Sequence, residues 1–116
     1  MEFHDLIQYC FQLKGATETY PFDNKTLVMK VMGKMFLLVD VHDPQTINIK
    51  CDPEKAIELR ERYVEIEPGY HMNKKHWNTV NIKGSLSHNF IQELILHSYE
   101  LVVASLPKKL QNELTR

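Results

Sequence analysis

The stretch TLVMKVMGKMFLLVDVHDPQTINIKC, residues 26–51, decides the fold of this chain. Three segments within it, 26–32, 35–41 and 46–51, are rich in apolar and β-branched residues and have the length of strands. Gly33 and Lys34 form a turn between the first two, and HDPQ at 42–45 forms the next turn. Because connections this short join strands that run in opposite directions, the stretch predicts an antiparallel meander.

Helical patterns flank the meander on both sides. Apolar residues recur at helical spacing over 2–13 and over 88–106, and a third helix over 52–63 opens with Asp-Pro-Glu, a typical helix start. Further short strands are expected at 17–22, 64–69 and 76–82, and a polar tail follows Pro107. The order predicts one α+β domain over 1–116, in which helices 2–13 and 88–106 pack on one face of an antiparallel sheet.

Composition limits the classes of function. The chain has 116 residues, which suits a single domain, and its 43% hydrophobic and 25% charged residues are typical of a globular protein. The 14 basic and 15 acidic residues give a net charge of −1, without the basic excess of a dedicated duplex DNA binder. With no apolar run near the ~18 residues of a membrane span and no signal-peptide pattern, we expect a cytoplasmic protein, with a monomer favoured.

The chain shows no residue spacing typical of a catalytic or metal-binding motif. The six histidines show no metal-ligand spacing, and the four glycines form no phosphate-binding loop. Cys10 and Cys51 fall on apolar positions and are expected to be reduced, buried thiols, although a spatial Cys/His pair remains open. Ser98 and Ser105 are interpreted as small residues that let the last helix pack closely. We therefore predict no metal, no cofactor and no catalytic residue.

Strand parity assigns the only tryptophan to a face. In HMNKKHWNTVNI, residues 71–82, Val80 and Ile82 are the apolar pair that faces the helices, so Trp77 faces the other side of the sheet. The same parity places Val28, Lys30, Asn48 and Lys50 on that open face. We expect the Trp77 ring to be at least partly accessible to solvent. In the alternative, helix 52–63 folds back over this face and buries it.

The uneven distribution of charge along the chain indicates a candidate binding surface. Residues 52–67 carry six acids and three bases, whereas residues 68–92 carry three lysines and no acid. The predicted binding residues are His71, Asn73, Lys74, Lys75, His76 and Trp77, with Lys30 and Lys50 from neighbouring strands. Lysines contact phosphate, and bases stack on exposed indoles. The surface therefore predicts a small binding module with weak, salt-sensitive and largely non-specific affinity for nucleic acid.

Several segments together resemble one family. These are TYPF (19–22), MKVMGKMF (29–36), NIKCDPEKAIELRE (48–61), PGYHMNKKHWNTV (68–80) and SYELVVASLPKK (98–109). In this order they resemble the MmcQ/YjbR-like proteins of bacteria over nearly the whole chain. The resemblance implies a frataxin-like α+β fold, and it implies DNA binding, a description that rests on fold comparison. Iron binding is not carried over, because the first helix holds only Glu2 and Asp5 as acids.

Two other functions remain open. One is a small-ligand protein or enzyme with a pocket near Tyr20, Phe22, His71 and His76. The other is a protein–protein adaptor, which would bind another protein through its unevenly distributed surface charge. A concave pocket that joins those side chains would favour the ligand-binding alternative, whereas a flat basic face would favour nucleic acid.

Overall fold

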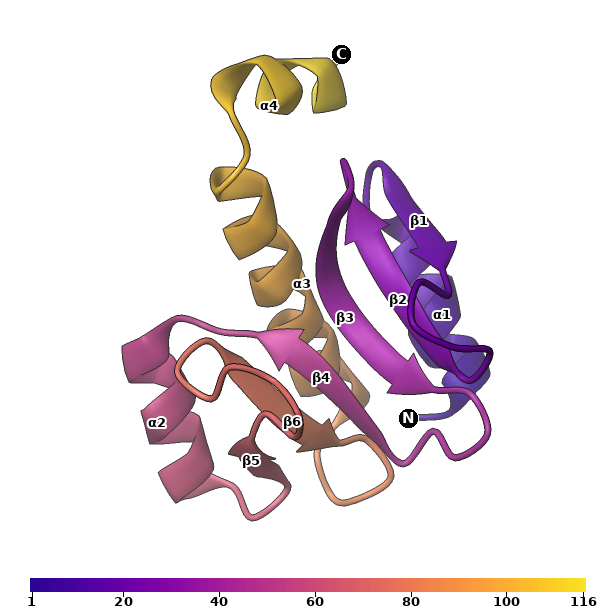
Figure 1. Cartoon of the computed structure of the whole chain (residues 1–116). Helices are drawn as coiled ribbons and strands as arrows, with labels where there is room; N and C mark the ends of the chain where they lie inside the picture. Colours follow the sequence, from indigo (N-terminus) through magenta and orange to yellow (C-terminus); the bar gives the residue numbers. More distant parts are fainter.

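A six-stranded antiparallel sheet organises the computed structural model, which describes residues 1–116 (Figure 1). In chain order the elements are α1 (Phe3–Gln12), β1 (Ala16–Thr19), β2 (Thr26–Val31), β3 (Lys34–Asp40), β4 (Thr46–Lys50), α2 (Pro53–Arg62), β5 (Ile66–Pro68), β6 (Trp77–Asn81), α3 (His88–Ala104) and α4 (Lys108–Leu114). The strands lie side by side in the order β1-β2-β3-β4-β6-β5, and every neighbouring pair is antiparallel. The α+β fold and the meander are thus confirmed.

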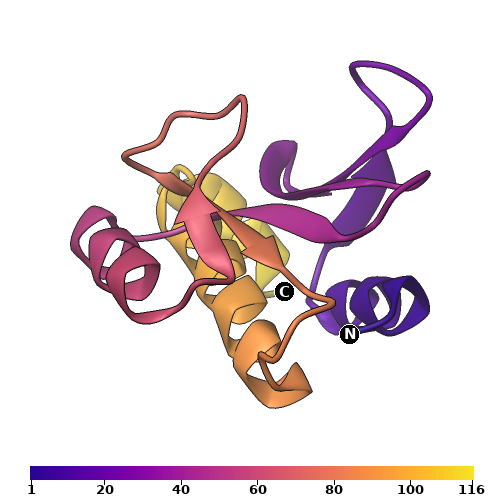
Figure 2. The same cartoon turned by 90° about the horizontal axis from the view of Figure 1, so that it is seen from below.

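The helices share one face of the sheet. Figure 2 shows α1 and α3 on the same side, as the apolar stripes predict. Their buried residues, such as Leu6 and Ile95, join a core that includes Met29, Val80 and Ile82 from the strands. Helix α2 lies at the β5 edge, where it adds Ala56 and Leu59 to this same core. No helix of the structure is long and apolar enough to cross a membrane.

The first hairpin turns one residue earlier than predicted. Its two loop residues are Met32 and Gly33, with φ of +48° and +83°, whereas Lys34 already belongs to β3. Two successive positive φ values match the backbone of a primed hairpin turn, which suits the right-handed twist of the strands. Gly33 adopts this conformation without strain, while Met32 is held there by the register of the hairpin.

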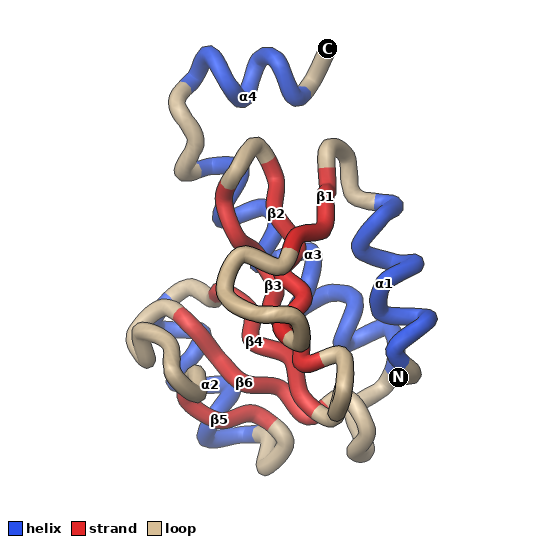
Figure 3. Tube along the Cα trace, turned by 45° about the vertical axis from the view of Figure 1, so that its right-hand side comes forward, coloured by secondary structure: helices blue, strands red, loops and turns tan.

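The predicted polar tail is partly helical. Helix α4 covers Lys108–Leu114, and Leu114 is buried. Figure 3 shows α4 at the end of the molecule where α1 turns into β1. A Cβ on Gly15 would come within 2.5 Å of Leu114 Cδ1, so the turn and the tail are in close contact. The prediction of no element here was wrong, because Leu110 and Leu114 are one helical turn apart and form an apolar stripe within a polar segment.

Strands β3 and β4 pair over a short length only. Their register joins Leu37–Val39 to Ile47–Ile49. The next pair in that register is Phe36 with Lys50, and there the hydroxyl of Ser98 on α3 takes the place of a direct bond between the strands. It donates to Phe36 O at 2.6 Å and accepts from Lys50 N at 2.8 Å. Beyond this point β3 curves away from β4 (Figure 1).

Candidate functional site

The sheet face opposite the helices carries its own small apolar cluster. Val28, Leu38 and Trp77 form it, and Met35 and Met72 pack against it. The predicted parity of Trp77 is therefore confirmed, since Val80 and Ile82 belong to the main core. The predicted exposure was wrong, because the residue is only 8% accessible. Its cover is the loop 69–76, which places Met72 against the cluster, and helix α2 is not the cover that the alternative proposed.

The loop 69–76 is held by backbone acceptors. Arg60 of α2 donates to the carbonyl oxygens of Lys74 and Trp77 and, at 2.6 Å, to Asn78 Oδ1. Asn73 Oδ1 accepts from Lys75 N at 2.9 Å, and Lys74 Nζ donates to Gly69 O at 3.1 Å. Asn73 and Lys74, both predicted binding residues, therefore help to shape the loop. Arg60 was missed because its partners are mainly backbone carbonyls, which leave no pattern in the sequence.

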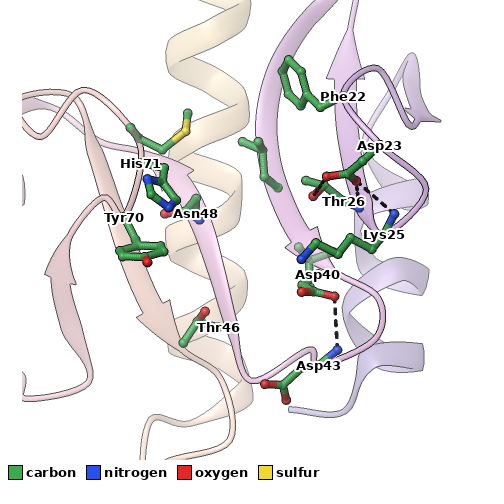
Figure 4. Close-up of a pocket in the computed structure, with 13 residues that line it drawn as sticks. Phe22, Asp23, Lys25, Thr26, Asp40, Asp43, Thr46, Asn48, Tyr70 and His71 are labelled. Atoms are coloured by element: carbon green, nitrogen blue, oxygen red, sulfur yellow. Dashed lines mark hydrogen bonds between the residues drawn. The ribbon is translucent and has the colours of Figure 1, made fainter.

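A chain of hydrogen bonds fixes the start of the loop to the sheet. Tyr70 N donates to the Thr79 hydroxyl at 2.9 Å, and that hydroxyl donates to Asn48 Oδ1 at 2.6 Å. His71 follows with φ +59°, and its ring packs against the Tyr70 ring at a tilt of 48° with centroids 4.1 Å apart. A positive φ is uncommon outside glycine, although histidine is among the residues enriched there. The result is a pair of exposed rings in contact with each other near Asn48 (Figure 4).

A second loop stands across the open face from the first. In residues 20–25 the carboxylate of Asp23 accepts from Lys25 N and Thr26 N, at 3.0 and 2.7 Å. These bonds lower the pKa of Asp23 and keep it ionised. Asp40 Oδ1 likewise accepts from His42 N at 2.8 Å. Figure 2 shows both loops rising on the side of the sheet away from α1 and α3.

Between the two loops lies a groove of about 730 Å³ (Figure 4). Its lining comes from both loops, from strands β2, β3 and β4 and from the turn between β3 and β4: Phe22, Asp23, Lys25, Thr26, Leu38, Val39, Asp40, Asp43, Thr46, Asn48, Tyr70, His71 and Met72. The Phe22 and Tyr70 rings at the two rims are 64% and 69% exposed. Because both rings border the same groove, the groove is the candidate binding surface of this face.

The groove is acidic. Three aspartates line it against one lysine, Lys25, so its formal charge is −2 with His71 neutral. None of these charges is in an ion pair, since the structure's single salt bridge joins Lys83 to Glu2 on another surface. Asp40 and Asp43 were not predicted as site residues, although both lie where β3 ends and the next turn begins, which is a common position for residues that border a site.

The predicted binding residues fall into separate places. His71 and Phe22 line the groove, whereas Tyr20 and His76 do not. Lys50 pairs with Trp77 in the sheet register, at the far end of β4 from Thr46. At ~3.3 Å per residue, Lys50 lies roughly 13 Å along the strand from Thr46 and roughly 7 Å from Asn48, the nearest lining residue of β4. Lys30 lies near the end of β2 on the same open face, and it is also outside the groove lining.

The remaining reactive groups are buried. Cys10 and Cys51 are free and buried, as predicted. Burial raises the pKa of the Cys10 thiol to about 12 and that of Cys51 to about 11. Thiols with such high pKa values hold their protons at neutral pH and are poor nucleophiles. No group of three or more histidine, cysteine, aspartate or glutamate side chains is arranged to hold a metal ion.

Comparison with known proteins identifies the family of this chain. The family model described as YjbR matches residues 11–101. The uncharacterized protein YjbR of Escherichia coli strain K12 is 34% identical over 110 residues, which cover 94% of this chain and 93% of that protein. The uncharacterized protein YbdF of E. coli O157:H7 is 40% identical over 91 residues, covering 78% and 75%. The crystal structure of Deinococcus radiodurans protein DR2400 superposes with a TM-score of 0.90 at 40% identity, covering 97% of this chain and 86% of that one. The chain therefore belongs to the YjbR family.

Proposed function

We propose that this protein is a binding module whose open-face groove takes a small organic ligand. The observation that supports this most is the groove itself, with an exposed aromatic ring on each wall and a floor formed by Leu38 and Asn48. An apolar floor with a few fixed polar groups is the usual composition of a small-molecule site. Because Thr79 holds Asn48 Oδ1, the amide hydrogens of Asn48 remain free to donate to a ligand.

The side chains in the groove favour binding over catalysis. Asp23 Oδ1 accepts from the backbone N–H groups of Lys25 and Thr26, and Asp40 Oδ1 accepts from that of His42. The bonds from Thr26 N and Lys25 N lower the pKa of Asp23, and a carboxylate with a lowered pKa is a poor general base at neutral pH. His71 has the Tyr70 ring as its partner and no orienting carboxylate. The groove thus offers stacking and hydrogen-bonding groups rather than a nucleophile activated by a base.

A fragment screen by nuclear magnetic resonance tests the proposal. Small aromatic compounds at about 1 mM, where weak sites begin to fill, should shift the amide signals of Asn48, Tyr70 and His71. The double variant Phe22→Ala with Tyr70→Ala should lose these shifts. Phe11→Ala removes an aromatic ring that is 49% exposed on α1 and serves as the matched control. Shifts that persist in the double variant, or a screen in which no compound moves these signals, would refute ligand binding in the groove.

Weak nucleic-acid binding is a second candidate, favoured by a different part of the open face. Lys30, Lys50, Lys74 and Lys75 are on this face or its covering loop, and none of them is paired with an acid. Four lysines neutralise about four phosphates at most, so affinity should be micromolar at best and should fall steeply with salt. Burial of Trp77 removes base stacking on the indole from this proposal.

A charge-reversal experiment tests nucleic-acid binding. Lys74→Glu with Lys75→Glu should abolish binding to single strands at about 50 mM salt. The matched control is Lys108→Glu with Lys109→Glu, which reverses two adjacent lysines on α4 and should have no effect. If both double variants lose affinity equally, binding follows net charge alone and this surface has no special role.

A further inference from the structure

The groove combines two features that together select a class of ligand. Its walls present the exposed rings of Phe22 and Tyr70, and its lining carries three carboxylates against one ammonium group. Aromatic faces attract cations through their quadrupole, and carboxylates attract them directly. Building on the proposed function, we infer that the ligand of this groove is a small organic cation with a planar or apolar body.

The carboxylates are arranged so that their charge remains available. Asp23 and Asp40 are fixed in their turns by backbone N–H donors, which hold the carboxylates in place and leave their negative charge uncancelled by any ion pair. The side chain of Asp43 has no hydrogen-bond partner, whereas its backbone N–H donates to Asp40 and its carbonyl oxygen accepts from Gln45 N. Asp43 is therefore the carboxylate best placed to approach a ligand without loss of a structural bond.

The geometry also separates this ligand from the phosphates of the second candidate function. Asp40, Asp43 and Thr46 surround the end of the groove where β3 passes into β4, whereas Lys50 lies at the opposite end of β4. Lys25 alone brings positive charge to the lining. A phosphate in the groove would meet three carboxylates, so like-charge repulsion disfavours anions there.

One indole series tests the charge of the ligand while its body stays constant. Tryptamine is a cation at neutral pH, indole-3-ethanol is neutral and indole-3-acetate is an anion. Each is titrated into the labelled protein at pH ~7.5, well above the ordinary histidine pKa, and the amide signals of Asn48, Tyr70 and His71 are followed. Tryptamine should bind tightest and indole-3-acetate weakest. The affinity for tryptamine alone should fall as salt rises, because salt screens exposed charges.

A single charge change sharpens the test. Asp43→Asn should weaken tryptamine about two- to fivefold, the range of one exposed ion pair, and leave indole-3-ethanol unchanged. Glu93→Gln, which removes an exposed acid from α3 on the helix side, is the matched control. Equal affinity for all three indoles at the groove signals would overturn the cation inference and leave ligand binding in place. If other aromatic fragments shift these signals and none of the indoles does, the cation inference is also overturned. Whether the groove binds any ligand is tested separately by the fragment screen.

Discussion

Replacing Ser98 with alanine should destabilise the domain by much more than the loss of one oxygen atom suggests. Ser98 is fully buried, and its hydroxyl serves β3 and β4 at once by donating to Phe36 O and accepting from Lys50 N. Alanine fits the same space, because only an oxygen is removed. The variant therefore isolates the hydrogen bonds from the packing of α3 against the sheet.

The magnitude follows from the two backbone groups left without a partner. A buried polar group that loses its partner costs about 1–3 kcal/mol. Phe36 O is buried and Lys50 N is half-buried, so the sum is about 2–4 kcal/mol. For a domain of this size that loss corresponds to a fall in Tm of roughly 8–16 °C. It is a large part of the roughly 5–15 kcal/mol that stabilises a typical domain.

Urea unfolding followed by circular dichroism measures the effect. Ser105→Ala is the matched control, because Ser105 is exposed and donates only to Val102 O within its own helix end. That control should change the free energy of unfolding by less than about 0.5 kcal/mol. A Ser98→Ala variant no less stable than the control would show that β3 and β4 bond directly, or through water, without the hydroxyl.

Three further outcomes are expected. Acrylamide and iodide should quench Trp77 fluorescence only weakly, since the residue is 8% exposed, and quenching like that of free indole would mean that the loop 69–76 opens in solution. Gly69→Ala should cost about 1–3 kcal/mol in urea unfolding, because its Cβ would lie 2.8 Å from Trp77 Cβ; a stability equal to wild type would show that the loop moves aside freely. Burial lowers the pKa of His97, whose Nε2 accepts from Asp52 N at 3.3 Å. The unfolded chain therefore binds this proton more readily, so stability should fall as pH drops through and below about 6.5; His97→Gln should flatten that part of the pH profile, and an unchanged slope would assign it to other groups.

Local patterns predicted most of the fold. Strand parity at Val80 and Ile82 assigned Trp77 to the correct face, because the period of two in a strand is a local property. Likewise the stripes of α1 and α3 specified the face that they cover. The prediction that Trp77 is exposed was wrong, because Met72 covers it from a loop that has no periodic pattern. Leu114 was missed for a related reason, since its contact with Gly15 joins distant parts of the chain.

The candidate site was predictable only in outline. Phe22 and His71 line one groove, because the loops that carry them lead into β2 and β6 of the same sheet, whereas Tyr20 and His76 lie outside its lining. The acidic end of the groove depends on Asp40 and Asp43, which were interpreted only as part of the strand 35–41 and of the turn 42–45. The bonds from Tyr70 through Thr79 to Asn48 cross three segments, and nothing in the spacing of these residues indicates them.

The short pairing between β3 and β4 has a mechanical consequence. Because these strands meet only over Leu37–Val39 and Ile47–Ile49, the sheet divides into two halves, β1-β2-β3 and β4-β6-β5. Phe22 belongs to the wall carried by the first half and Tyr70 to the wall carried by the second. Segments joined by so narrow a seam are expected to open as separate cooperative units in hydrogen exchange. A ligand that contacts both walls would link the two halves of the sheet, and it would therefore slow hydrogen exchange in both halves together.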